Sequence, residues 1–374
     1  MEIQAMDRIT KFEELYDEDV KTDTHTEEPG KDRDVHTGQR RRRSAGRLSR
    51  NRSRNHRGHV LPALLVIICF SAALGIIGFK LIVGLREKDN NRINAVEITA
   101  EQERLEGIRQ SFSEGESTLS ILRKYYPEDL VLYYDNRYSF YPVDKSLKKH
   151  SFDPEKVRKN TDGTWGYVDG DLKVEKGIDV SAHQGDIDWE KVASSNISFA
   201  MIRAMYRGYE TGRLVEDKTF RTNIENAAAN GIKTGVYIFT QAITKKEVDE
   251  EISMLSGLLG AYDISYPVVV DVEDVAGKNE RMEQLTREER TEIVKYYCER
   301  ISEAGYEPMI YFNIHGALEL VELSELEKYD KWFAAYDSDF YYPYEYKMWQ
   351  YKDTGKVDGI TGNVDFNLYF PEKQ

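Results

Sequence analysis

Residues 266–274 read YPVVVDVED. The β-branched apolar residues of this stretch favour a buried strand. Asp271 and Glu273 stand two positions apart at the end of that strand, so their carboxyls share one face. Like charges this close repel, which raises the pKa of at least one of them. Two interpretations follow: a solvated strand end, or a pair of acids for acid–base catalysis.

On both sides of this strand, short apolar segments alternate with longer amphipathic segments, a pattern that predicts a mostly parallel sheet with crossover helices. Eight strands predict an α/β fold, an irregular (β/α)8-like barrel whose last three strands lack room for full helices. A doubly wound open sheet is the alternative, but no Gly-rich loop follows the first strand to support nucleotide binding. The strand candidates are 177–181, 199–204, 234–240, 266–273, 308–312, 331–336, 347–351 and 363–369, and the helix candidates are 188–195, 217–230, 245–260, 286–304 and 315–329.

Residues 60–79 form an apolar run of 20 residues without a charge. As a helix such a run spans about 30 Å, the thickness of the hydrocarbon core of a bilayer. The apolar core of a cleaved signal peptide is shorter and lies near the N-terminus. We therefore predict a retained single-pass transmembrane helix over 60–85 that contacts the lipid bilayer.

Basic residues flank only one side of this run. Nine arginines and no acid lie between Arg40 and Arg57, whereas the other side mixes both charges. The positive-inside rule then predicts a cell-membrane protein with a cytoplasmic N-terminus and an extracytoplasmic C-terminal domain. An arginine run also occurs in nucleic-acid patches, but beside a membrane span it indicates topology and contact with anionic lipid.

These features divide the chain into four predicted parts. Residues 1–59 are a disordered basic cytoplasmic tail, because they carry many charges and few apolar residues. The transmembrane helix is followed by an extracytoplasmic stalk and small β module over 86–170. The barrel domain occupies 171–374, and we expect that fragment to fold alone.

Within the stalk, "TAEQ" at Thr99 predicts the start of a helix by its capping-box pattern. "LVLYY", "DNR" and "YSFYPV" predict a hairpin. "TWGYVDGDLKV" predicts another around Asp169 and Gly170. No chemistry is assigned to this module.

Net charge and cysteine content argue against a nucleic-acid partner, a disulfide and a cysteine metal site. The formal net charge of −14 argues against a nucleic-acid partner for the bulk of the chain. The two cysteines, Cys69 and Cys298, lie in unrelated segments and build neither a disulfide nor a metal site. We expect no metal and no cofactor.

Four acids meet at one mouth of the predicted barrel. Catalytic groups of such barrels sit at the C-terminal ends of strands, where Asp179, Asp271 and Glu273 are found. Asp365 lies in the last strand, which closes onto the first and so comes beside Asp179. Carboxylate clusters also bind hard cations; that alternative leaves the aromatic residues near the strand ends unexplained. These are Tyr237, Phe239, Tyr311, Trp332, Tyr336 and Trp349.

Carboxylates flanked by aromatic platforms fit glycoside hydrolysis better than metal binding. No serine lies beside a convincing base. His183 and His315 are isolated, and we interpret each as a loop or surface histidine.

Four segments carry a specific resemblance: GIDVSAHQGDIDWEKV (177–192), VVVDVED (268–274), WFAAY (332–336) and MWQYKDTGKVDGITGNVDFNLYF (348–370). They resemble the signature segments of glycoside hydrolase family 25, the Chalaropsis-type lysozymes or N-acetylmuramidases. The resemblance covers about residues 177–370. It implies an irregular (β/α) barrel that cleaves the β-1,4 bond between N-acetylmuramic acid and N-acetylglucosamine in peptidoglycan.

By this resemblance Glu273 is the general acid and Asp271 its partner, and Asp179 and Asp365 match the remaining family carboxylates. Glu273 must hold a proton near neutral pH while Asp271 stays ionised. Similar D-x-E pairs use the 2-acetamido oxygen of the substrate as nucleophile, which retains configuration; an inverting mechanism with Asp179 or Asp365 activating water stays open. We expect sugar contacts from Tyr237, Tyr336, Trp349 and Gln350.

The leading hypothesis is a membrane-tethered peptidoglycan hydrolase. The alternatives are a non-catalytic wall-binding module and a hydrolase of another amino-sugar polymer, such as chitin.

Overall fold

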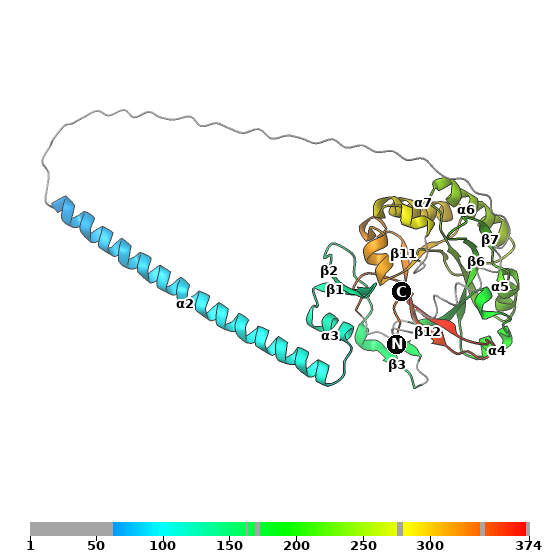
Figure 1. Cartoon of the computed structure of the whole chain (residues 1–374), viewed down its shortest axis with the longest axis horizontal. Helices are drawn as coiled ribbons and strands as arrows, with labels where there is room; N and C mark the ends of the chain where they lie inside the picture. The colour runs from blue at the N-terminus through cyan, green and yellow to red at the C-terminus, as the bar shows by residue number, and fades with distance from the viewer. Residues whose placement is uncertain (1–62, 162–163, 169–172, 275–279, 337–340, 372–374) are drawn as a thin grey trace, which may run out of the picture. The chain divides into compact units, whose positions relative to one another are not determined.

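The computed structural model describes residues 63–161, 164–168, 173–274, 280–336 and 341–371 (Figure 1). The chain divides into two compact units, Met1–Gln110 and Ser111–Gln374. The second unit contains all the strands described below, and the predicted tail over 1–59 lies outside the described residues.

Helix α2 runs from Ala63 to Ser113 and includes all the described residues of the first unit. The prediction that a helix begins at Thr99 is wrong, because no glycine or proline interrupts the chain between Gly84 and Thr99. The helix ends where Gly115 adopts a positive φ of 80°. The amide of Glu116 donates to the carbonyl of Ser111 at 3.1 Å, the backbone pattern of a Schellman cap.

No helix among the described residues is both long and apolar enough to cross a membrane. The apolar run 60–79, which carries the membrane prediction, lies outside the residues whose side chains are described.

A small module opens the second unit. Helix α3 (Thr118–Tyr125) precedes the antiparallel pair β1 (Asp129–Tyr134) and β2 (Arg137–Pro142). Asp135 and Asn136 form the predicted tight turn, and both have positive φ, which a type I′ hairpin requires. A 3-10 turn, η1 (Pro154–Lys156), leads into β3 (Val157–Lys159), which pairs with β4 (Trp165–Tyr167). The observed partner of β4 is thus the preceding strand, and the turn predicted at 169–170 lies outside the described residues.

The hairpin packs on the barrel rather than standing apart from it. Leu130 and Leu132 are buried in the same apolar cluster as the barrel strands. Phe152 stacks on Phe370 with ring centroids 4.4 Å apart. Residues 111–161 therefore share a core with the barrel.

Eight strands close the predicted barrel. The sheet runs β5-β13-β12-β11-β10-β9-β8-β6, and β5 also pairs with β6 to complete the ring. β13 lies antiparallel to both of its neighbours, whereas the other contacts in the ring are parallel. The bounds are β5 (Glu175–Val180), β6 (Phe199–Arg207), β8 (Lys233–Phe239), β9 (Val268–Asp271), β10 (Pro308–Asn313), β11 (Asp330–Ala334), β12 (Met348–Gly355) and β13 (Val364–Tyr369), with β7 (Leu214–Glu216) paired to β6.

Helices cover the outside of the ring (Figure 1). They are α4 (Trp189–Ser194), α5 (Phe220–Ala229), α6 (Lys245–Leu259) and α7 (Arg287–Glu303), joined by the short turns η2 (Ala182–Gln184) and η3 (Arg281–Gln284). Four of the predicted helices are confirmed. The fifth, over 315–329, is wrong: the chain there forms the π-turn η4 (Gly316–Leu320) and the 3-10 turn η5 (Leu323–Glu325).

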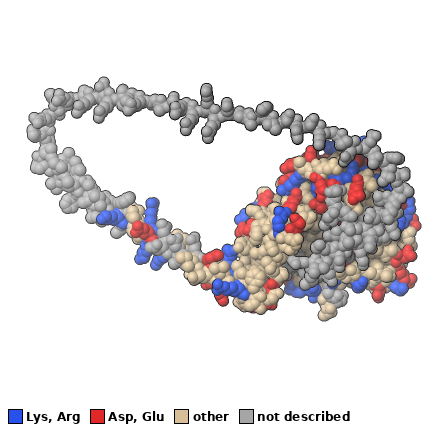
Figure 2. Space-filling view, in the orientation of Figure 1, with Lys and Arg blue, Asp and Glu red and all other residues tan. Residues whose placement is uncertain are grey.

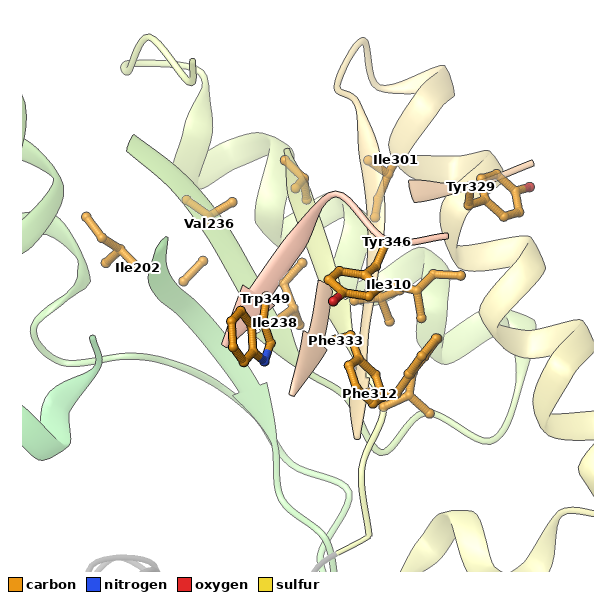
Figure 3. Packing of buried hydrophobic residues seen from close by; sticks show 14 of the residues in the cluster. Ile202, Val236, Ile238, Ile301, Ile310, Phe312, Tyr329, Phe333, Tyr346 and Trp349 are labelled. Atoms are coloured by element: carbon orange, nitrogen blue, oxygen red, sulfur yellow. The ribbon is translucent and has the colours of Figure 1, made fainter. Parts of the chain in front are cut away.

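Apolar residues form two layers, because successive side chains of a strand point to opposite faces. The outer layer fills the space between the ring and the helices, and Figure 3 shows its packing, with Trp349 and Phe333 among its residues. The inner layer fills the barrel. Its buried members are Phe199, Met201, Tyr266, Val269, Met309, Tyr311, Trp332, Ala334 and Met348. At Gly177 a Cβ would lie 2.3 Å from the Phe199 ring, so only glycine fits that inward position.

Candidate active site

The strand period places the predicted acids above the inner layer. Val269 belongs to that layer, so Asp271, two residues on, faces inward at the end of β9. Asp179 occupies the corresponding place on β5, two residues after Gly177. The residues that end the strands on this face therefore form the mouth of the barrel.

Asp365 reaches the same mouth because β13 runs against its neighbours. It lies near the start of β13 and is paired in register with Asp179. In an antiparallel strand the N-terminal end lies beside the C-terminal end of its partner. The predicted proximity of Asp365 and Asp179 is thus present.

Asp179 is held by two amide donors. Gln350 Nε2 and Asn367 Nδ2 each donate to Asp179 Oδ2 at 2.8 Å. Asn367 is itself fixed by Trp332 Nε1, which donates to its Oδ1 at 2.8 Å. Two donors on one oxygen compensate a buried carboxylate for the water it has lost. Asp179 is consequently a rigid acceptor rather than a mobile one.

Asp271 presents an unused acceptor. The residue is 5% exposed, and its Oδ1 has no hydrogen-bond partner among the described residues. Burial raises the pKa of Asp271 well above its usual value, the charges of Glu273 and Asp179 raise it further, and Arg203 opposes them. A buried acceptor without a partner costs stability unless a ligand satisfies it.

Glu273 is half-buried just beyond the end of β9. Burial raises its pKa to about 7, and the charges of Asp179 and Asp274 contribute. The pKa values of Glu273 and Asp271 are both raised, so the two carboxyls titrate as a coupled pair.

Tyrosine hydroxyls line the mouth. Tyr311 and Tyr336 both donate to Gln350 Oε1, at 2.8 and 2.7 Å. Tyr336 is 41% exposed and its pKa is raised, first by burial of the hydroxyl and then by Asp365, Glu273 and Asp179. Three of the four acids thus lie around this one tyrosine.

Of the expected sugar contacts, Tyr237 and Gln350 also join the acids. Burial raises the pKa of Tyr237 well above its usual value, and the charges of Asp179 and Asp271 act on it. Trp349 does not join them. Its neighbours Met348 and Gln350 face inward, so Trp349 points outward, packs near Trp165 at 5.8 Å and donates to the carbonyl of Ala335.

Sequence reasoning missed Arg203. This buried residue donates from Nε to Asp217 Oδ2 at 2.8 Å, and its Nη1 lies 3.4 Å from His183 Nε2. Its charge acts on Asp271 and Tyr237. The available signal was a lone arginine in the apolar strand FAMIRA, two residues after the inward-facing Met201.

His315 is not the surface histidine that we expected. It is 8% exposed, and its Nε2 lies 3.0 Å from Asp274 Oδ2. Asp274 also accepts from Arg290 Nη1 at 2.9 Å. Asp274 directly follows Glu273 in the chain.

Figure 2 shows acidic and basic side chains interspersed on the visible face. Among the described residues no group of three or more His, Cys, Asp or Glu side chains is arranged to hold a metal ion.

The β/α barrel and the paired carboxyls at its mouth define this protein as a glycoside hydrolase. Residues 178–360 match the family model of Glycosyl hydrolases family 25.

Relatives match about half of the chain. Uncharacterized protein YegX of Escherichia coli K12 is 29% identical over 207 residues, which cover 52% of this chain and 68% of the relative. Lysozyme M1 of Streptomyces globisporus is 27% identical over 203 residues, covering 52% and 67%. A solved family 25 glycosyl hydrolase from Bacillus anthracis gives a TM-score of 0.45 at 23% identity, with 55% of this chain and 93% of that chain covered.

Proposed function

We propose that this chain is a membrane-tethered peptidoglycan hydrolase that cleaves the β-1,4 bond between N-acetylmuramic acid and N-acetylglucosamine. The name of Lysozyme M1, a relative over 52% of this chain, supports this substrate. One observation carries the proposal: Glu273, beside a second carboxyl in a family 25 domain, has a pKa raised to about 7. A carboxylic acid that is protonated at neutral pH is what departure of a sugar oxygen requires.

Asp271 orients the 2-acetamido group of the substrate. Its partnerless Oδ1 is a buried acceptor that suits the N–H of a 2-acetamido group. That hydrogen bond favours the ionised carboxyl, since a bond to the charged form lowers a pKa. Glu273 then keeps its proton and donates it to the departing glycosidic oxygen. With its N–H held, the acetamido oxygen attacks the anomeric carbon as that oxygen leaves. Water then gives a proton back to Glu273 and opens the resulting oxazoline, so configuration is retained.

The rest of the mouth holds the sugar. Tyr237, Tyr336 and Gln350 lie around the acids and offer hydroxyl and amide groups to a pyranose. Arg203 keeps a positive charge beside Asp271 and so supports its ionised form when substrate binds.

Mass spectrometry of purified peptidoglycan digested by the full-length protein tests the activity, with Glu273→Gln as the matched control. We expect fragments with N-acetylmuramic acid at the reducing end, and none from the control. Fragments with N-acetylglucosamine at the reducing end would refute the bond assignment. Cleavage of chitin but not of peptidoglycan would indicate a hydrolase of another amino-sugar polymer. Binding to peptidoglycan without cleavage would indicate a non-catalytic wall-binding module.

The membrane tether is a separate part of the proposal. Its support is the uncharged run 60–79 beside nine arginines. Protease added to intact wall-stripped cells should remove the C-terminal domain and leave the basic tail protected. Trimming of the tail alone would mean the opposite orientation, and release of the whole protein by a salt wash would mean that no tether exists.

A further inference from the structure

Beyond the four acids, a chain of contacts joins the β1–β2 hairpin to the catalytic mouth. Tyr134, the last residue of β1, stacks on the His315 ring with centroids 3.8 Å apart and an interplanar angle of 9°. Tyr141 of β2 donates its hydroxyl to Glu319 Oε1. Glu319 in turn lies 3.3 Å from His315 Nδ1. His315 Nδ1 has no hydrogen-bond partner among the described residues, so the hairpin restrains His315 by stacking on its ring.

His315 passes this restraint to Asp274. His315 Nε2 lies 3.0 Å from one carboxyl oxygen of Asp274, and Arg290 donates to the other at 2.9 Å. With one partner on each oxygen, the plane of the Asp274 carboxyl is fixed. Arg290 is buried and also donates to the carbonyl of Met282 at 2.8 Å. Arg290 therefore attaches Asp274 to the barrel domain, independently of the hairpin.

The position of Asp274 makes the restraint relevant to catalysis. β9 ends at Asp271, so Glu273 lies beyond the strand pairing, and the nearest backbone bond runs from the Val272 amide to the Tyr311 carbonyl at 3.2 Å. Asp274 is the next residue along the chain whose side chain is held by contacts, those to His315 and Arg290. Its fixed carboxyl therefore defines where the Glu273 backbone sits.

We propose that the β1–β2 hairpin is a positioning element of the catalytic site: Tyr134 holds the His315 ring, and His315 holds Asp274 next to the catalytic acid Glu273. This inference rests on the proposed function of Glu273. It extends the catalytic machinery to a segment about forty residues before the family 25 match, which begins at residue 178.

The charges around Asp274 set the sign of the expected pH effect. Arg290 comes from α7, His315 follows β10, Glu280 precedes η3, Glu319 lies in η4, and the Tyr134 hydroxyl comes from the hairpin. Burial opposes ionisation of Asp274, but its bonds to His315 and Arg290 lower its pKa, so it is an anion beside Glu273. Moving that anion away lowers the pKa of the general acid.

The test compares Tyr134→Leu, which removes the stacked ring, with Tyr134→Phe, which keeps it. Tyr138→Leu is the matched control, because Tyr138 is exposed and pairs with Tyr133 on the opposite face of the hairpin. The full-length protein is assayed on a soluble glycan fragment for kcat, KM and pH profile. Thermal unfolding is recorded for each variant.

We expect Tyr134→Leu to lower kcat by about tenfold, the scale of a modest misplacement of a catalytic group. KM should change little, and the alkaline limb of the profile should move to lower pH. Tyr134→Phe and Tyr138→Leu should behave as wild type. In a double-mutant cycle, Tyr134→Leu should add no further loss to His315→Ala, because both remove the same restraint.

A wild-type kcat and profile in Tyr134→Leu, or losses that add in the cycle, overturn the inference and leave the proposed function standing. A wild-type protein that releases no muramic acid ends refutes the proposed function, and the inference falls with it. A loss in Tyr134→Leu that only follows lowered thermal stability, with an unchanged pH profile, also overturns the positioning role.

Discussion

Replacing Glu273 by Gln removes the proton donor while keeping the size of the side chain. With a pKa of about 7, Glu273 is protonated in about half of the molecules at pH 7. At the ordinary value of 4.5 the protonated share would be about 0.3%, so the site holds roughly 150-fold more acid at neutral pH. General acid catalysis contributes about 10²–10⁴-fold, and we expect Glu273→Gln to lose that much of kcat/KM on a natural glycan.

The same pKa predicts the direction in which activity changes with pH. A general acid works in its protonated form, so wild-type activity should fall as pH rises through about 7. The Glu273→Gln variant should lack this limb. Glu190→Gln, an exposed glutamate of α4, is the control and should keep the wild-type profile.

The assay uses two soluble substrates, a natural glycan fragment and an aryl glycoside with a good leaving group. An aryl oxygen leaves with little protonation, so the aryl substrate should restore much of the rate of Glu273→Gln. A variant that keeps wild-type rates on the glycan, or that retains the alkaline limb, refutes the assignment of Glu273. Equal loss on both substrates would also refute it.

Three other changes probe the surroundings of that acid. Asp271→Asn should be impaired on both substrates, because the aryl group does not replace its contact with the acetamido N–H; rescue by the aryl glycoside would contradict this role. Leu132→Ala, in the hairpin face buried against the barrel, should cost about 2–5 kcal/mol of unfolding free energy in denaturant titrations, and a cost near zero would mean that this face is not packed. The fragment 171–374 lacks that face and should unfold at a lower temperature than 111–374; equal melting temperatures would show that the barrel domain needs no module.

The sequence predicted the barrel because period-two strands and amphipathic helices are local signals. The antiparallel direction of β13 could not be predicted from such local patterns. Too few residues separate β12 from β13 for a crossover helix, which permits the antiparallel arrangement that brings Asp365 to the mouth. The missing helix after β10 has a similar origin, since an apolar period alone does not separate a full helix from the shorter turns η4 and η5.

The site was predictable in its acids and not in their partners. Asp271 and Glu273 stand together in one motif, and the strand positions in a closed barrel placed Asp179 and Asp365 at the same mouth. Asn367 and Arg203 act through side-chain contacts across strands, which no spacing reveals. Trp349 failed to join the site because only one of two adjacent strand residues faces inward, and the sequence did not say which.

The antiparallel closure of the barrel also fixes when the enzyme becomes active during its own synthesis. The bond from Asn367 to Asp179 joins residues 188 positions apart, among the most distant contacts in the chain. Contacts of such separation form late, since the cost of loop closure precedes their gain. Until β13 leaves the ribosome, β5 and β12 are open edges, and Asp179 lacks the Asn367 donor and the neighbouring Asp365. A nascent chain shorter than about residue 370 therefore carries a complete D-x-E motif but no assembled mouth, and a premature stop before β13 leaves the cell with an inactive, aggregation-prone barrel rather than an unregulated hydrolase.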